Sequence, residues 1–154
     1  MYPILEYNSI LWSPNLVYLI DLIESVQRKF SKSIPSLSAL PYSSRLNRLN
    51  LQPLELRRLH LDLINYYKIL NGLSPLNPND YFLMYSPITS TRSILPSLLK
   101  PLRTSSNLLA FFSYRSVDAW NYLSSDVKLL TYFPAFKSAI KIVDLSAFLK
   151  CSFY

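Results

Sequence analysis

The sequence predicts an all-α fold, an irregular bundle of about five or six helices with one long insert rich in proline and serine. Apolar residues recur at spacings of three and four in several stretches, as in helices that bury one face. Half of the 154 residues are hydrophobic, so a sizeable core can form within one domain. Repeats of solenoid length and sustained heptads do not occur, which argues against repeat arrays and coiled coils.

The first strong helical pattern covers residues 16–30. Ser13 and Pro14 are suited to the N-cap and the first turn, and Ile34-Pro35 ends the pattern. Six apolar residues share one helical face and are expected to point inward: Leu16, Leu19, Ile20, Ile23, Val26 and Phe30.

A short helix is expected at 41–49, followed by a long helix that opens at Pro53 and stops at Asn71-Gly72 in a left-handed turn. The long helix is apolar around much of its girth, so we expect it to be central. Its expected inward stripe is Leu56, Leu59, Leu63, Tyr67 and Leu70. Its expected solvent-facing side is Glu55, Arg57, Arg58, Asp62 and Lys68.

The remaining chain divides into an insert and a second group of helices. Residues 74–106 are expected to form an irregular insert, with a turn of helix at 79–83 and a small hairpin. A helix is expected over 107–122, and a last one begins near Pro134 with Phe136, Ile140 and Val143 inward. We therefore expect residues 1–154 to form one helical domain or domain fragment, made of helices in 1–73, the insert, and helices in 107–154.

The residue types needed for catalysis are scarce. His60 and Cys151 are each the single residue of their kind, and His60 is expected to be a packed or solvated helix residue. The nine carboxylates are isolated, whereas two-metal polymerase chemistry needs clustered aspartates. Gly72 is the single glycine, which excludes glycine-rich phosphate loops. The sequence therefore predicts no catalytic residues, no metal site and no cofactor.

The predicted location is inside the cell, in the nucleus or the cytoplasm. Charged residues interrupt every apolar run before it reaches the roughly 18 residues that a membrane-spanning helix needs. The N-terminal residues lack the basic segment of a secretory signal. One cysteine allows no internal disulfide, in keeping with a reducing compartment.

The net charge of +7 favours polyanionic partners, and part of it lies in two tracts that lack carboxylates. These tracts, 25–54 and 81–117, also contain tyrosine and phenylalanine, as in grooves that follow a phosphate backbone and stack bases. A basic surface that is merely solvated explains the same composition equally well. The candidate nucleic-acid-binding residues are Arg28, Lys29, Lys32, Arg45, Arg48, Arg92, Lys100, Arg103 and Arg115.

Short motifs along almost the whole chain occur in a fixed order. They are Leu5-Glu6-Tyr7, Leu11-Trp12-Ser13-Pro14, Ile20-Asp21-Leu22-Ile23-Glu24-Ser25-Val26-Gln27-Arg28-Lys29-Phe30, Leu40-Pro41-Tyr42, Arg45-Leu46, Leu56-Arg57-Arg58, Asp62-Leu63, Tyr67-Lys68-Ile69-Leu70-Asn71-Gly72, Thr91-Arg92, Phe111-Phe112-Ser113, Trp120-Asn121-Tyr122-Leu123 and Phe136-Lys137. In this order and spacing the sequence resembles the region downstream of the catalytic palm in non-LTR (LINE-type) retrotransposon reverse transcriptases, particularly those related to the Jockey group.

The resemblance implies a truncated thumb or post-polymerase segment of an RNA-directed DNA polymerase. The family's endonuclease and magnesium-binding aspartates lie upstream of the matched region, so the chain alone is not expected to be an enzyme. The chain departs from the family at Ser90-Thr91-Arg92-Ser93, where Arg-Thr-Arg-Gly is usual, and at Ser124, which replaces a proline. These departures, and a start codon inside the family's reading frame, fit a truncated genomic copy.

The implied partners are RNA or an RNA–DNA hybrid, bound weakly and with little sequence preference, and the upstream polymerase core in a full-length protein. Such a segment is expected to expose apolar side chains where the core would pack. The alternative is a helical protein-interaction module without nucleic-acid binding. A third possibility, a protein of the membrane surface, would use the aromatic and basic residues together.

Overall fold

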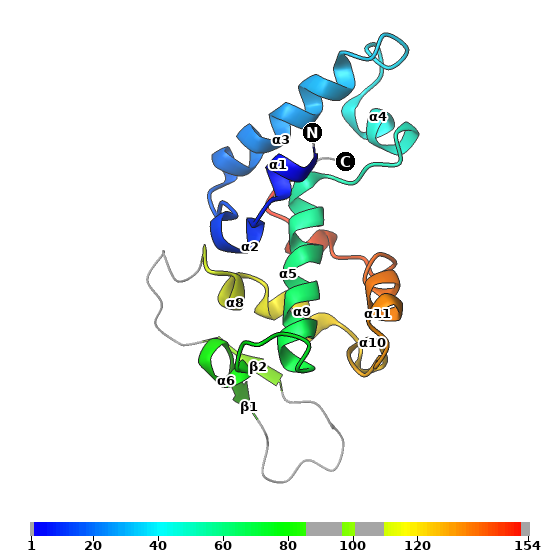
Figure 1. The fold of residues 1–154 in the computed structure, drawn as a ribbon. Coiled ribbons are helices and arrows are strands. Elements are labelled where there is room, and N and C mark those ends of the chain that lie inside the picture. The colour runs from blue at the N-terminus through cyan, green and yellow to red at the C-terminus, as the bar shows by residue number, and fades with distance from the viewer. Residues whose placement is uncertain (1, 86–96, 101–109, 152–154) are drawn as a thin grey trace.

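The computed structural model describes residues 2–85, 97–100 and 110–151, and side chains from Ile4 onward (Figure 1). Helices dominate these residues, which confirms the mainly α-helical prediction. The elements are α1 (Tyr2–Glu6), α2 (Ser9–Trp12), α3 (Val17–Lys32), α4 (Tyr42–Arg48), α5 (Leu54–Leu70), α6 (Pro78–Tyr81), β1 (Leu83–Tyr85), β2 (Ser97–Leu99), α8 (Phe112–Arg115), α9 (Val117–Tyr122), α10 (Ser125–Lys128), α11 (Phe133–Ala139) and the 3-10 helix η1 (Ser146–Phe148).

The strands correct the all-α prediction. β1 and β2 pair antiparallel, with Met84 opposite Leu98, so the hairpin expected within the insert is present. The side-chain amide of Asn121 in α9 holds β2 at its middle residue, accepting from the Leu98 N–H at 3.1 Å and donating to the Leu98 carbonyl at 2.8 Å. This pair of bonds attaches the small sheet to the helices.

Helix α5 runs through the middle of the molecule, as its sequence predicts (Figure 1). Pro53 caps its first turn and Gly72 adopts a φ of 68° just past its end, the left-handed stop that glycine favours. Tyr66 and Tyr67 are fully buried and anchor two aromatic groups. The Tyr66 ring packs against Phe82, Phe112 and Trp120, whereas the Tyr67 ring stacks on Phe133 and Phe136.

The prediction that Arg58 and Asp62 lie on a solvent-facing side of α5 is wrong, because both are buried. Asp62 accepts two hydrogen bonds from the Arg115 guanidinium, at 2.6 and 2.7 Å, and one from the Ser116 hydroxyl at 2.8 Å. Arg58 donates to the Leu5 carbonyl at 2.9 Å, and its guanidinium lies over the Trp12 ring. A charged side chain is tolerated inside a protein when it is paired and hydrogen-bonded in this way.

The buried face of α3 also differs from its prediction. Leu16 and Phe30 are exposed, whereas the line that points inward is mainly polar: Ile20, Glu24, Gln27 and Ser31. The N-cap of α3 is Leu16, while Ser13 lies at the C-terminal end of α2. Polar groups occupy the inner face because residues from α4 and the start of α5 supply hydrogen-bond partners there.

The main apolar cluster belongs to the second half of the chain. Its buried members run from Leu63 to Leu145, and within the described residues the segment before α5 adds Ile10 at its edge. Ile20, Leu37 and Leu46, which precede α5, are buried outside this cluster, and polar contacts join α1, α2 and α3 to α5 or its N-terminus. Figure 1 shows α3 and α4 side by side at one end of the molecule, with α6 and the small sheet at the other end of α5.

The helix predicted over 107–122 is interrupted. Residues 107–109 lie outside the described residues, and Ser116, with φ −108° and ψ 7°, separates α8 from α9. Ser124, which stands where the resembled family has proline, caps α10 by accepting from the Val127 N–H. Phe136 and Ile140 are buried and Val143 is partly buried, as predicted, but α11 ends at Ala139, so Val143 lies beyond the helix that was expected to carry it.

Among the described residues, the helices are too short or too polar to span a membrane.

Candidate nucleic-acid interface

Three candidate cations are exposed at the end of the molecule formed by α3 and α4. Lys29 and Lys32 lie in the last turns of α3, and Arg48 ends α4. None of the three has an ion pair with another described residue. We call Lys29, Lys32 and Arg48 the α3–α4 basic surface.

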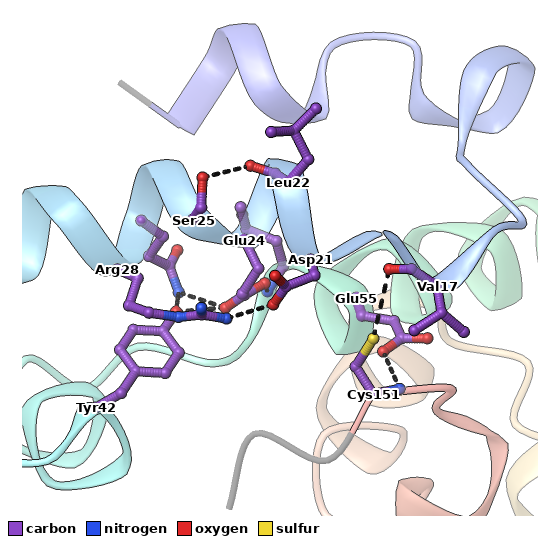
Figure 2. A network of polar contacts seen from close by, with 11 residues as sticks. Val17, Asp21, Leu22, Glu24, Ser25, Arg28, Tyr42, Glu55 and Cys151 are labelled. Atoms are coloured by element: carbon purple, nitrogen blue, oxygen red, sulfur yellow. Dashed lines mark hydrogen bonds and ion pairs between the residues drawn. The ribbon is translucent and has the colours of Figure 1, made fainter. Parts of the chain in front are cut away.

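Arg28 and Arg45 are close in sequence to this surface but are engaged within the protein, and Figure 2 shows Arg28 beside Asp21 and Tyr42. Arg28 forms an ion pair with Asp21 at 2.6 Å, and Arg45 is buried and donates to the Arg28 carbonyl at 3.0 Å. Both guanidinium groups lie over the Tyr42 ring, 5.5 and 5.4 Å from its centroid. These two arginines therefore join α3 to α4.

Elsewhere, Lys100 is ion-paired with Asp118, and Arg115 with Asp62. Arg115 also donates to the carbonyls of Ala110 and Ser9 at 2.8 and 3.2 Å, so it joins α8 to α2 and α5. Arg92 and Arg103 lie outside the described residues.

The expectation that tracts without carboxylates keep unopposed charge is wrong for Arg28, Lys100 and Arg115. The reason is that the fold pairs these cations with carboxylates from outside each tract, and Asp62 is 53 residues away from its partner Arg115 in sequence. Charge patterning along a sequence does not reveal such long-range pairing. Because the other described candidate cations are paired or buried, the α3–α4 basic surface is the part of the described candidate site that remains accessible.

A buried hydrogen-bond network positions that surface (Figure 2). The fully buried Glu24 carboxylate accepts from the Tyr42 hydroxyl and, at 2.8 Å, from the Leu54 N–H at the start of α5. Gln27 donates to the Tyr42 hydroxyl and to the Gln52 carbonyl, both at 3.1 Å. Burial raises the pKa of Glu24, while the bonds from Tyr42 and Leu54 and the charge of Arg28 oppose that rise. Helix α3 is thus fixed to α4 and α5 with a defined outward face.

That outward face changes character along α3. Tyr18, Leu22, Ser25, Lys29 and Lys32 follow one another at spacings of four and three, so they lie on one side of the helix, opposite Glu24 and the other buried residues. Tyr18 and Leu22 are 66% and 62% exposed. One helical face therefore offers an apolar half followed by a basic half.

The reactive residues are separated in the fold. Cys151 lies beside Val17 and Glu55, donating its N–H to the Glu55 carboxylate at 3.1 Å (Figure 2), whereas His60 is buried beside Ile140 and Lys141. They do not form a nucleophile–base pair. In the described part of the chain, no three histidine, cysteine or acidic residues are arranged to hold a metal ion.

Sequence reasoning missed a second group of cations. Lys137 and Lys141 line a cleft of about 660 Å³ together with Arg57 and His60 of α5. The one signal in the sequence was the spacing of four between the two lysines, which places them on one side of a helical turn. Arg57 was expected to be solvent-facing on the grounds of polarity alone, and it is ion-paired with Glu6 at 2.7 Å.

Comparison of the chain with models of protein families, with curated proteins and with solved structures finds no match.

Proposed function

We propose that the chain is the helical segment that follows the polymerase core in a LINE-type reverse transcriptase, and that it contacts the RNA or RNA–DNA hybrid held by that core. The observation that carries the proposal is the outward face of α3, where apolar Tyr18 and Leu22 precede the basic Lys29 and Lys32. The apolar half suits a neighbouring protein domain, and the basic half suits a phosphate backbone. In this function the segment acts inside the cell and binds the nucleic acid without catalysing a reaction.

The sequence motifs of the resemblance support the proposal through their contacts with one another. Glu24 of one motif bonds Tyr42 of the next, and Asp62 bonds Arg115. Glu6 of the first motif pairs with Arg57. The contacts of Glu24 with Tyr42 and of Glu6 with Arg57 thus join residues from different motifs, and Asp62 is held by Arg115, which lies just after a further motif.

The direct test is binding of a short single-stranded RNA and an RNA–DNA hybrid at low salt, measured by fluorescence anisotropy. We expect weak binding with little sequence preference, reduced about tenfold by Lys29→Gln with Lys32→Gln, a change of about 1.4 kcal/mol. The matched control is Lys68→Gln with Lys150→Gln, which removes the same charge elsewhere and leaves binding unchanged. Primer extension on an RNA template should yield no product.

The second candidate is a protein-interaction module. Exposed apolar side chains on α1, α2 and the turn between them favour it, among them Ile4, Tyr7 and Leu11, which are 65% to 80% exposed. This reading expects no effect of the Lys29 and Lys32 substitutions and no RNA binding at low salt. The same anisotropy experiment therefore separates the two candidates.

A further inference from the structure

A cleft of about 660 Å³ lies between α5 and the end of α11, and its lining includes none of Lys29, Lys32 and Arg48. Ligand sites in proteins typically measure about 300 to 1,000 Å³. Its walls come from α1, the link between α4 and α5, α5 itself, and the residues around the end of α11. The cleft is lined by Glu6, Asn50, Leu51, Gln52, Arg57, His60, Leu61, Ile64, Lys137 and Lys141.

The lining carries excess positive charge. Arg57, Lys137 and Lys141 stand against one carboxylate, Glu6, which is already paired with Arg57. Both lysines are exposed, and neither ammonium has an ion pair within the described residues. The Lys137 ammonium lies over the Phe133 ring, 5.7 Å from its centroid, a contact that leaves its charge unneutralised. A phosphate monoester, with a charge of about −1.5 to −2 at neutral pH, complements the two ammonium groups.

The rest of the lining suits a flat, partly polar ring system. Leu51, Leu61 and Ile64 supply an apolar wall, and the side chains of Asn50 and Gln52 carry amide donors and acceptors. The lining has the composition usual for small-ligand sites, in which a few polar groups orient a ligand against apolar surface.

His60 is one of the lining residues and carries a buried, unsatisfied polar atom. The side chain is 7% exposed, and its Nε2 has no hydrogen-bond partner among the described residues. Burial, and then the charge of Lys141, lower the pKa of His60 to about 4, so the ring is neutral at neutral pH. An unpaired buried polar atom is costly, and a ligand group that reaches it would remove that cost.

We propose that this cleft binds a nucleoside phosphate, with the phosphate at Lys137 and Lys141 and the base against Leu61 and Ile64. The ligand is either a free mononucleotide or one unit of a nucleic-acid strand. The site is separate from the α3–α4 basic surface and is independent of the proposed polymerase context.

The test uses the imidazole of His60, which is the single histidine of the chain and therefore gives an unambiguous NMR signal. Adenosine 5′-monophosphate is titrated into the protein, with adenosine and inorganic phosphate as separate arms. We expect the monophosphate to shift the His60 signals and to bind at least about tenfold more tightly than either fragment. A single-stranded oligoadenylate provides the strand arm.

The test variant is Lys137→Gln with Lys141→Gln. The control is Lys68→Gln with Lys150→Gln, which removes the same charge from residues outside the cleft and outside the α3–α4 basic surface. An unchanged thermal melt verifies folding. The proposal is supported if the His60 shifts saturate, the cleft variant weakens the affinity about tenfold, and the control variant leaves the affinity unchanged. If the mononucleotide produces these shifts, a free nucleotide is a ligand; if the oligoadenylate alone does, the source is a strand. Absence of shifts in both arms, or shifts that the cleft variant leaves unchanged, overturns the proposal.

Discussion

At the scale of single residues, the polar side chains inside the protein decide how its helices meet. Asp62 and Glu24 are almost fully buried, and each receives hydrogen bonds from residues far away in sequence. A folded protein tolerates a buried carboxylate when such partners are present, and it is strongly destabilised when they are removed. The stability of this fold should therefore depend on a few ion pairs more than on its exposed charges.

Asp62→Asn should lower the free energy of unfolding by about 3 kcal/mol, because it leaves the Arg115 guanidinium without its carboxylate in a largely buried position. The measurement is urea denaturation monitored by circular dichroism. Asp21→Asn is the matched control, since it removes the exposed ion pair with Arg28 and should cost less than about 1 kcal/mol. Equal effects of the two substitutions would show that the Asp62 pair does not stabilise the fold as described.

His60 should make the protein less stable in mild acid. Its pKa is lowered from 6.5 to about 4 by burial and by Lys141, so the unfolded chain binds the proton more readily between these values. The stabilisation is present above pH 6.5 and is lost as the pH falls toward 4, by an amount on the order of 3 kcal/mol.

The pH experiment compares the native chain with His60→Gln across this range. The difference isolates His60 from Glu24, whose raised pKa acts with the opposite sign. If the two proteins lose stability in parallel between pH 6.5 and 4, the imidazole is not buried in its neutral form.

At the scale of elements, local signals in the sequence predicted α5 well and the orientation of α3 poorly. Pro53 and Gly72 mark the ends of α5 through their own backbone preferences, so its limits could be predicted from the chain alone. The inward face of α3 depends on Glu24, whose partners Tyr42 and Leu54 are 18 and 30 residues away. No periodicity within α3 carries that information. The apolar pattern was right for Ile20, which is buried, and wrong for Leu16 and Phe30, which are exposed.

The same reason limited the prediction of the candidate site. Lys29, Lys32 and Arg48 were chosen because their tract lacks carboxylates, and the structure shows all three exposed. Arg45 and Arg115 were predicted to bind nucleic acid for the same reason, although Arg45 is buried and Arg115 is ion-paired with Asp62. Composition revealed which residues carry charge but not which of them remain accessible.

The prediction of exposed apolar side chains is confirmed on α1, α2 and α3, and it has a measurable consequence. Tyr18→Ser with Leu22→Ser should decrease binding of a hydrophobic dye and self-association at high concentration. Stability should change by less than about 0.5 kcal/mol, because both side chains are mostly exposed. Analytical ultracentrifugation and dye fluorescence measure these effects. A native chain that is monodisperse and does not bind dye would contradict the role of this face as a docking surface.

At the scale of the whole molecule, the two halves are held together by different forces. An aromatic core around Tyr66 and Tyr67 organises the chain from α5 onward, whereas polar bonds from Glu24, Arg58 and Arg115 attach the first four helices. The attached layer presents both the apolar face and the α3–α4 basic surface. A partner that binds this layer should therefore contact helices α1 to α4, whose positions are set by ion pairs and hydrogen bonds.

The most direct test of the proposed nucleic-acid contact is the salt dependence of binding to a single-stranded RNA. Three contacts, from Lys29, Lys32 and Arg48, predict that log K falls against log salt with a slope of about −2, at roughly −0.7 for each phosphate neutralised. Lys29→Gln with Lys32→Gln should flatten the slope to about −0.7 without loss of helix content, while Lys68→Gln with Lys150→Gln should leave it near −2. Binding that is absent at low salt, or a slope that the two pairs of substitutions change equally, would contradict the proposal that the α3–α4 basic surface grips nucleic acid.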